Sequence, residues 1–481
     1  MKGSTNAKHV KAARLTSRLV RNVIFPLWAR RDHPAYWKYA REFERTQFLA
    51  TDALQAIQIG RLQRLLQHAH RNCVFYQRRM QSVGLRPEDL TSIEQISSLP
   101  LLTKREIQDH RADLQAQNFR ESARVRNQTG GSTGSPLQFY VDRERFDSRL
   151  ASTVRHNRWA GLRPGDWLAV LWGARLDQTE SRGLWDWLRN TFLYRNVSLN
   201  TSNVSESGWE DYIARLRKKR PRFLLAYAQA AVLFARYLRE RGIDDIKFNS
   251  IITTAEVLLP GQRQFLEDVF GGRVFNRYGC REVSVIASEC EFHTGMHVNS
   301  EALLVEIVPT RSMNGPGGKI VITDLMNFSM PLIRYEVGDV GSWADDQKCP
   351  CSRGLPMLGD VQGRTTDFLV LDDGRSISGP ALTLVVADME DVRQVQFVQK
   401  GPAQVTLRVV PGRAYGAATV EELRRRLGLY LNARTMLDIE AVESIQSEAS
   451  GKYRFVINES AESGVAPQPV STAGEINIAH R

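Results

Sequence analysis

The chain has 481 residues, of which 42% are hydrophobic and 25% charged, and its formal net charge is +12. This length exceeds one compact core, so at least two domains are expected, and the composition is that of an ordinary soluble globular protein. No run reaches the roughly 18 to 20 apolar residues of a membrane span, and basic residues interrupt the apolar stretches of the N-terminus, which argues against a signal peptide. A cytoplasmic location is the default expectation.

The positive charge is concentrated at the N-terminus. Residues 1–45 carry 11 Lys or Arg against 3 acidic residues, a surplus of eight out of the total of twelve. The body is therefore only mildly basic, which argues against nucleic acid as a partner. Residues 1–9 are expected to be disordered. Between residues 10 and 37, apolar residues recur at helical spacing at Leu15, Leu19, Val23 and Leu27. We interpret this segment as a basic helix packed on the body; the alternative is a helix on an anionic membrane surface.

Helical and strand-like patterns follow along the chain. A helix is expected from about residue 52 to 70, and Thr103 is expected to cap the start of another. Four strand-like runs are interleaved with two helical patterns: 168–171, 223–226, 228–241 (helix), 251–254, 260–270 (helix) and 274–278. This alternation favours a parallel sheet covered by helices. Shorter strands broken by Gly and Pro from 301 to 343 indicate a barrel-like or antiparallel subdomain.

The predicted fold class is α/β. A large N-terminal domain of mixed α/β layers, containing the barrel-like subdomain, is followed by a small, mobile α+β domain. The expected boundaries place a basic arm and helix at 1–45, the large domain at 46–363, the C-terminal lid domain at 364–459 and a disordered tail at 460–481. The tail is rich in Ser, Ala and Pro, a composition typical of disorder.

The densest cluster of Gly and hydroxyl residues is a candidate phosphate-binding loop. It consists of Thr129, Gly130, Gly131, Ser132, Thr133, Gly134, Ser135 and Pro136. Such a loop presents backbone N–H groups and hydroxyls to a polyphosphate without bulky side chains in the way. It differs from the common P-loop, since no Gly-Lys-Ser/Thr follows. Taken alone, the string is equally typical of a surface turn.

The loop resembles the phosphate-binding motif of the acyl-adenylate-forming superfamily, which includes acyl-CoA synthetases, luciferases and the adenylation domains of peptide synthetases. Further strings resemble later motifs of that superfamily in the required order: Thr254-Ala255-Glu256, Tyr278-Gly279-Cys280-Arg281-Glu282, Ile333-Arg334-Tyr335-Glu336-Val337-Gly338-Asp339, Gly363-Arg364 and Ser450-Gly451-Lys452. The resemblance implies that Ala255 and Glu256 lie along the adenine of ATP and that Tyr278, followed by Gly279, stacks on it.

The remaining roles implied by the resemblance fit the chemistry of the residues. Glu282 would hold Mg²⁺, which accepts hard oxygen ligands. Asp339 would accept hydrogen bonds from both ribose hydroxyls, and Arg364, at the hinge, would donate to ribose or phosphate oxygens. Lys452 would bridge the carboxylate and the α-phosphate, because adenylation builds negative charge on phosphorus that a cation must stabilise.

Within the superfamily, the chain most resembles the phenylacetate-CoA ligase branch and its capsule-biosynthesis-type members, over roughly residues 60 to 458. Leu65 to Ala69, Leu99 to Lys104 and Glu289-Cys290 carry this likeness. It implies that ATP and a carboxylic acid give acyl-AMP, whose acyl group passes to CoA. The alternatives are transfer to an amine or a sugar hydroxyl, or a non-catalytic membrane- or polymer-associated binding protein on the same fold.

Some positions depart from the superfamily pattern. Leu137 stands where many members carry a lysine after the phosphate loop, so backbone donors and metal would have to do more there. Arg281 replaces the usual Thr or Ser before Glu282, and Thr366 replaces a charged hinge residue. These changes leave adenylation in place and bear more on the second half-reaction.

Five cysteines in a chain without an export signal argue against disulfides. Cys349 and Cys351, joined by Cys290 and His297 from an upstream segment, would form a Cys₃His set suited to structural zinc. His293 competes with His297 for the fourth position. Reduced, buried cysteines without metal are the alternative.

Overall fold

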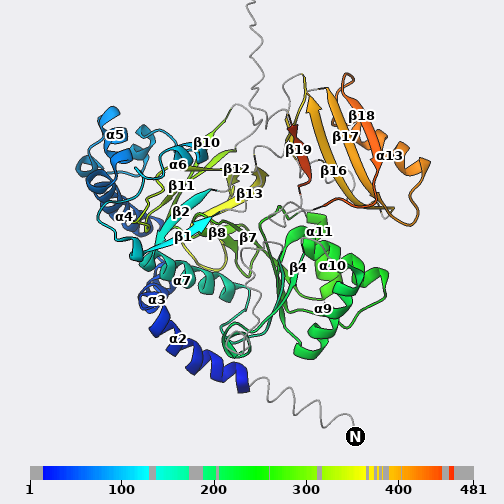
Figure 1. Cartoon of the computed structure of the whole chain (residues 1–481), viewed down its shortest axis with the longest axis horizontal. Helices are drawn as coiled ribbons and strands as arrows, with labels where there is room; N and C mark the ends of the chain where they lie inside the picture. The colour runs from blue at the N-terminus through cyan, green and yellow to red at the C-terminus, as the bar shows by residue number, and fades with distance from the viewer. Residues whose placement is uncertain are drawn as a thin grey trace, which may run out of the picture. The chain divides into compact units, whose positions relative to one another are not determined.

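The computed structural model describes residues 15–128, 137–172, 188–201, 205–258, 260–310, 317–364, 368–372, 376–378, 382, 389, 391–401, 403–446 and 454–459. The chain divides into two compact units, the first comprising residues 1–365 and 446–454 and the second 366–445 and 455–481 (Figure 1). The expected disordered start and tail, the loop Thr129–Pro136 and Lys452 lie outside the described residues. No helix in the described part is long and apolar enough to cross a membrane.

The first unit is built on an eleven-stranded sheet, one half of which is parallel. In spatial order these strands are β4 (Asn196–Asn200), β3 (Leu168–Trp172), β5 (Phe223–Tyr227), β6 (Ser250–Thr254) and β7 (Arg273–Cys280). The interleaved helices are α9 (Glu206–Lys219), α10 (Ala228–Glu240) and α11 (Pro260–Phe270). The predicted alternation of strands and helices is thus confirmed.

The other half of the sheet is antiparallel. Continuing from β7, its strands are β8 (Ser284–Glu289), β9 (Met296–Val298), β13 (Met357–Arg364), β12 (Tyr335–Trp343), β11 (Gly318–Asp324) and β10 (Leu303–Pro309). The antiparallel interpretation of residues 301–343 is confirmed, and these strands continue one sheet with the parallel half. In the described residues β13 bonds to β9, which continues the ladder towards β7, so these strands do not close on themselves. A separate hairpin pairs β1 (Arg124–Gln128) with β2 (Gln138–Asp142).

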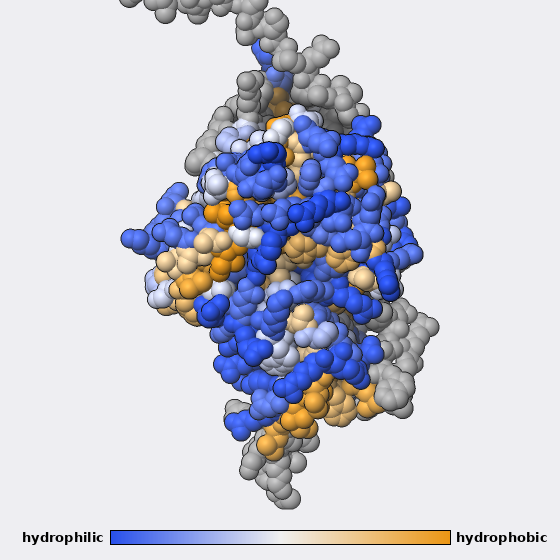
Figure 2. All heavy atoms as spheres, turned by 90° about the vertical axis from the view of Figure 1, so that its left-hand side faces the viewer, coloured by the Kyte–Doolittle hydropathy of each residue, from blue (hydrophilic) through white to orange (hydrophobic). Residues whose placement is uncertain are grey.

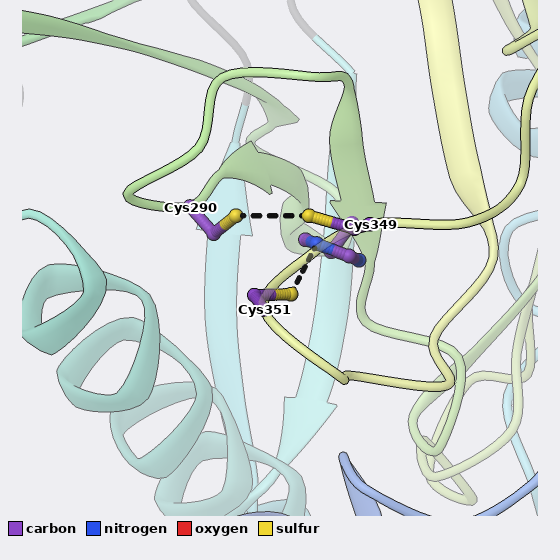
Figure 3. A group of neighbouring side chains, drawn as sticks. Cys290, Cys349 and Cys351 are labelled. Carbon is purple, nitrogen blue, oxygen red and sulfur yellow. Dashed lines mark hydrogen bonds between the residues drawn. The ribbon is translucent and has the colours of Figure 1, made fainter.

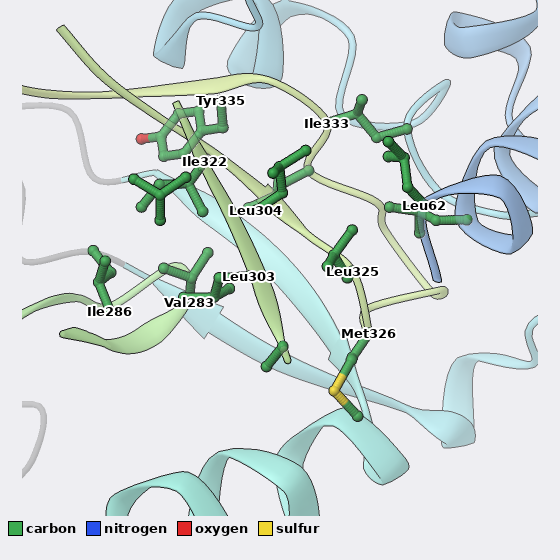
Figure 4. Packing of buried hydrophobic residues seen from close by; sticks show 14 of the residues in the cluster. Leu62, Val283, Ile286, Leu303, Leu304, Ile322, Leu325, Met326, Ile333 and Tyr335 are labelled. Carbon is green, nitrogen blue, oxygen red and sulfur yellow. The ribbon is translucent and has the colours of Figure 1, made fainter. Parts of the chain in front are cut away.

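Helices from the N-terminal third pack on the antiparallel half. They are α3 (Tyr36–Thr46), α4 (Thr51–Asn72), α5 (Val74–Ser82) and α6 (Lys104–Asp109), with short 3₁₀ turns at Pro87–Asp89, Glu94–Ser98 and Glu121–Ala123. Leu62 of α4 joins Leu303, Ile322 and Tyr335 in one buried cluster (Figure 4). Thr103 caps α6, as predicted, and the structure adds that it does so through a reciprocal capping box with Glu106.

The N-terminal helix packs on the body, as predicted, through a side other than its regularly spaced apolar stripe. Residues 15–19 are helical and continue through a π turn, η1 (Val20–Ile24), into α2 (Phe25–Asp32). Val20, Phe25 and Ala29 are buried. The expected apolar stripe, Leu15, Leu19, Val23 and Leu27, is exposed instead. The π turn places residues 20, 25 and 29 on one side of the helix, and that side faces the core. The stripe lies on another side and faces outward.

The long helix α7 (Arg143–Trp159) carries buried charges that lock it to the sheet. Arg145 pairs with Asp324 of β11 at 2.8 Å, with both side chains fully buried. Arg155 pairs with Glu301 at 2.7 Å. Burial alone would raise the pKa of Glu301, but Arg155 and Thr46 outweigh it and lower that pKa. Removing either partner of such a pair would leave an uncompensated charge in the interior.

The second unit is a small α+β domain, as predicted. Its four-stranded sheet runs in the order β18 (Met436–Ala441), β17 (Gln404–Pro411), β16 (Val392–Gly401) and β19 (Val456–Asn458). Helix α13 (Ala417–Leu427) contributes Leu423 to a core with Phe397 and Leu407. A short hairpin pairs β14 (Phe368–Val370) with β15 (Ser376–Ser378).

Gly272, between α11 and β7, provides a test of the close packing in the parallel half of the first unit. A Cβ at Gly272 would collide with the backbone of Phe248 and Asn249. We expect Gly272→Ala to lower the stability of the first unit by about 1–3 kcal/mol, measured as a lower thermal melting temperature. Gly60, inside α4, has nothing within 4 Å of an added Cβ, so Gly60→Ala should leave the melting temperature unchanged or raise it. Equal effects of the two changes would contradict the packing.

Candidate active site

The predicted adenine stretch lies at the carboxyl edge of the parallel strands. Ala255 and Glu256 directly follow β6, and Tyr278 lies near the end of the neighbouring β7. Ala255 has φ +69°, a left-handed conformation that is uncommon for a residue with a side chain. The Glu256 carboxylate accepts a hydrogen bond at 2.7 Å from the backbone N–H of Gln229, at the start of α10. Ligands of open α/β sheets bind at this edge.

Tyr278 and Asp339 meet across the sheet. The Tyr278 hydroxyl donates to Asp339 Oδ2 at 2.7 Å, although β8, β9 and β13 separate β7 from β12 in the strand order. Four strand intervals in a flat sheet would span about 19 Å. The sheet therefore curls strongly here and brings the predicted adenine-stacking and ribose-binding residues together.

Glu282 is held in the turn between β7 and β8. The Tyr335 hydroxyl donates to Glu282 Oε1 at 2.9 Å. From α7, Arg149 donates to the Glu282 carbonyl and Arg145 donates to the Val283 carbonyl at 3.2 Å. The predicted magnesium ligand is thus buried and fixed at both its backbone and its side chain.

Both phenols in these contacts are donors at neutral pH. Burial, together with the neighbouring Asp339 carboxylate, raises the pKa of Tyr278 well above its usual value. Burial and Glu282 do the same for the pKa of Tyr335. Burial and Glu282 also raise the pKa of the Cys280 thiol. The region consequently holds two carboxylates whose hydrogen-bonding neighbours stay protonated.

Gly279 is required by the close approach of β8. A Cβ at this position would lie 2.6 Å from the Ser284 carbonyl oxygen, and the strand register shifts between Tyr278 and Gly279. A glycine here lets β8 approach the end of β7 closely, just after Tyr278. This gives a structural reason for the glycine in the predicted motif.

The stem of the predicted phosphate loop is tied to the Glu282 turn. Gln128 and Gln138, on either side of residues 129–136, are register partners in the β1–β2 hairpin. Arg281 donates through Nε to Asn127 Oδ1 at 3.2 Å. Arg281, which departs from the superfamily pattern, directly precedes Glu282. It therefore links the Glu282 turn to β1, the strand that enters the loop.

The predicted ribose-binding residue and the predicted hinge residue lie opposite each other on neighbouring strands. Asp339 on β12 and Arg364 on β13 are register partners in the antiparallel ladder. Gly338, with φ +87°, precedes Asp339. The structure thus brings together Tyr278, Glu282, Asp339 and the backbone of Arg364. The loop residues Thr129 to Gly134 and Lys452 lie outside the described part of the chain.

Sequence reasoning did not assign roles to three supporting residues. Tyr335 lies in a predicted motif to which the resemblance gives no role, and its place four residues before Asp339 on one strand is the signal that points to one. Arg149 lies on a polar helix that a sequence pattern would place at the surface. Asn127 carries no recognisable signal, because its partner Arg281 comes from a distant segment.

The predicted cysteine and histidine ligands form one cluster. Cys290 follows β8, His297 lies on β9, and Cys349 and Cys351 lie in the loop before β13. Cys290 Sγ is 3.5 Å from Cys349 Sγ, and Cys351 Sγ is 3.3 Å from His297 Nε2 (Figure 3). The four donor atoms all lie within 4.8 Å of one another.

This geometry fits tetrahedral zinc. Zn–S bonds of about 2.3 Å place sulfurs about 3.8 Å apart around the ion. His297 Nδ1 lies 3.2 Å from the Leu355 carbonyl oxygen, and this contact assigns the proton to Nδ1 and leaves Nε2 facing the sulfurs. Burial lowers the pKa of His297 to about 4, so the ring is neutral at pH 7. The competing His293 contacts Glu289 at 3.0 Å and is not among the clustered ligands.

Hydrogen-bond donors surround the sulfurs of the cluster. Backbone N–H groups of Phe292 and Arg353 point at the sulfurs of Cys290 and Cys351, at 3.5 and 3.4 Å. Burial alone would raise the pKa of Cys349, but hydrogen bonds, with that from Thr294 the largest, lower it. Burial raises the pKa of Cys290 to about 12, so in the absence of metal this cysteine is a neutral thiol.

The chain is similar in sequence to proteins whose names belong to the branch that its motifs resemble. The family described as "CapK C-terminal domain" matches residues 369–459. Phenylacetate-coenzyme A ligase of Thermus thermophilus is 27% identical over 67% of this chain and 73% of that protein. Protein CapK of Staphylococcus aureus is 22% identical over 84% of this chain and 88% of that protein.

Solved structures share the fold. A crystal structure of 2-hydroxyisobutyryl-CoA ligase in the postadenylation state, in complex with R3-HIB-AMP, matches with a TM-score of 0.71 and 22% identity over 88% of this chain and 93% of that one. At this identity the likeness establishes the fold. Sequence and fold together confirm the predicted relationship: the chain is a relative of the phenylacetate-CoA ligases and CapK and has the fold of adenylate-forming ligases.

Proposed function

We propose that this protein is an ATP-dependent, AMP-forming ligase that activates a carboxylic acid as acyl-AMP and transfers the acyl group to CoA. The observation that carries the proposal is the meeting of Tyr278, Glu282, Tyr335 and Asp339 at the carboxyl edge of the parallel sheet. These residues come from two motifs that lie far apart in the sequence and are joined by two hydrogen bonds. The names of the relatives and the shared fold support the same activity.

Each site residue has a part in the first half-reaction. The carboxylate attacks the α-phosphorus and pyrophosphate leaves. Ala255, Glu256 and Tyr278 would border the adenine, and Asp339 would bind the ribose. Glu282 fits a Mg²⁺ ligand because its carboxylate is buried and oriented by Tyr335. The ion would neutralise phosphate charge. Residues 129–134 would supply backbone donors to the phosphates.

Lys452 would supply the cation at the reacting phosphorus, and Arg364 would lie at the hinge between the half-reactions. The division of the chain between residues 365 and 366 is consistent with a boundary at Arg364. Rotation of the small domain would then exchange the adenylation and transfer states. CoA is the proposed acceptor because several relatives are named CoA ligases; an amine or a hydroxyl is the alternative acceptor.

We expect Lys452→Ala to lower carboxylate-dependent ATP–pyrophosphate exchange by about a hundredfold or more, because it removes a cation aimed at developing charge. The exchange assay isolates the first half-reaction and does not depend on the acceptor. Lys400→Ala, at an exposed lysine of β16, is the matched control and should exchange normally. Normal exchange by Lys452→Ala would contradict the role given to that lysine.

We expect Glu282→Gln to raise the Mg²⁺ concentration needed for half-maximal exchange by about tenfold or more. Gln keeps the side-chain size and can still accept from Tyr335, but it lacks the charge that binds the ion. The control is Glu336→Gln, next to Tyr335 on β12, whose partner is Lys319 at 2.9 Å. An unchanged Mg²⁺ dependence in Glu282→Gln would rule out this residue as the ligand.

We also infer that Cys290, His297, Cys349 and Cys351 hold a structural zinc ion. Four protein ligands leave no open position for chemistry. The cluster ties the ends of β8 and β9 to the loop that leads into β13, and Gly354 in that loop bonds to the Gln47 carbonyl. The ion would thus fix the segment that leads through β13 to Arg364.

Protein purified without chelator should contain about one zinc per chain, measured by elemental analysis. The double variant Cys349→Ser with Cys351→Ser should lose the metal and melt at a lower temperature. Cys73→Ala, a buried cysteine outside the cluster, should keep it. Less than about 0.1 zinc per wild-type chain would contradict the inference and favour the reading of reduced, metal-free cysteines.

A further inference from the structure

A stripe of aliphatic side chains lies exposed along the N-terminal helix. Leu15, Leu19, Val23 and Leu27 are 45–59% exposed. In an α-helix, a repeat of four residues drifts by about 40° per step, but the π turn at Val20–Ile24 holds an extra residue and offsets that drift. The four side chains consequently face outward in a line about 18 Å long.

The helix that carries this stripe is anchored to the body, so its exposed face is fixed. Val20 and Phe25 are buried beneath it. Arg21 donates to Asp166 at 2.8 Å and to the Pro164 carbonyl at 3.2 Å. A Cβ at Gly165 would lie 2.6 Å from the Ser17 carbonyl oxygen, so the loop approaches the helix backbone closely. The stripe is therefore a feature of the folded unit rather than of a loose arm.

Exposed aromatic residues from other elements lie beside the same helix. Tyr194, 48% exposed, packs edge-on against Trp28 of α2, and its neighbour Phe192 is 41% exposed. Phe146 of α7, 43% exposed, stacks on His33 at the end of α2. Apolar surface gathers at the lower end of the face in Figure 2, where α2 lies in Figure 1. Exposed aromatic side chains from two other segments thus lie beside the helix that carries the stripe.

Positive charges outnumber negative ones around this patch, because Asp32, Asp166 and Glu144 are each paired with a cation. Arg18 and Arg30 are exposed and make no ion pair in the described residues. From residue 15 to 32 the helix has four arginines and one acidic residue, Asp32, which pairs with Arg31, and residues 1–14 add Lys2, Lys8, Lys11 and Arg14 in the sequence. An interface with a second copy would bring these cations together, which is unfavourable. Aliphatic and aromatic side chains flanked by arginines match an anionic bilayer surface.

We propose that the face formed by Leu15, Leu19, Val23 and Leu27, with Phe146, Phe192 and Tyr194 beside it, docks the protein on an anionic lipid bilayer. The aliphatic side chains enter the boundary between headgroups and acyl chains, and the aromatic rings lie at the headgroup level. Arg18 and Arg30 contact lipid phosphates. The helix lies along the surface without spanning the bilayer, in keeping with the lack of a membrane-spanning helix among the described residues.

Cosedimentation of the full chain with vesicles tests this proposal. The wild type should bind vesicles of phosphatidylcholine containing phosphatidylserine, should bind pure phosphatidylcholine much more weakly, and should lose binding at high salt. Leu19→Ser with Leu27→Ser should reduce binding about tenfold or more, because two inserted side chains are lost. These residues are half exposed, so the melting temperature should not change.

Matched variants separate the patch from general surface effects. Leu429→Ser with Met436→Ser removes two other exposed apolar side chains and should bind as the wild type. Arg18→Gln with Arg30→Gln should weaken binding, while Arg120→Gln with Arg413→Gln, the same change in charge elsewhere, should weaken it less. Failure of the wild type to bind anionic vesicles would overturn the proposal. A second result would also overturn it: the wild type is a dimer, Leu19→Ser with Leu27→Ser makes it a monomer, and lipid binding does not change. The patch would then be covered by a second copy of the chain.

Discussion

Two crossed hydrogen bonds between β7 and β12 organise the candidate site. The Tyr278 hydroxyl, on β7, donates to Asp339 on β12, and the Tyr335 hydroxyl, on β12, donates to Glu282 in the turn after β7. Each motif thus supplies one phenol and one carboxylate. Because three strands separate β7 from β12 in the sheet, both bonds require its curl. The buried pair of Arg145 with Asp324 and the contact of Arg149 with the Glu282 carbonyl hold this curl from the side of α7.

The same arrangement joins the site to the other functional regions of the chain. Asp339 pairs in register with Arg364, at the end of the first unit. β13, which carries Arg364, begins just after the loop that bears Cys349 and Cys351. The stem of the predicted phosphate loop reaches the Glu282 turn through Asn127 and Arg281. A metal at the cysteines would therefore act on catalysis indirectly, by keeping β13 in place.

Local patterns in the sequence predicted the parallel strands, the helices between them and the Thr103 cap, because alternation and capping depend on near neighbours. The cysteine cluster was also predicted, with His297 favoured over His293. The curl of the sheet and the roles of Tyr335 and Arg149 were not, because they depend on contacts between distant segments. The spacing of Leu15, Leu19, Val23 and Leu27 predicts the N-terminal helix, but a period of four does not tell which side faces the core when a π turn intervenes.

Transfer of oxygen from substrate to AMP tests the central claim most directly. Adenylation joins a carboxylate oxygen to the α-phosphorus, and later attack at the acyl carbon leaves that oxygen on AMP. A carboxylic acid that supports turnover, labelled with heavy oxygen in its carboxylate, should give AMP carrying one labelled oxygen, detected by mass spectrometry. Unlabelled AMP, or ADP and phosphate in place of AMP and pyrophosphate, would contradict an acyl-adenylate mechanism.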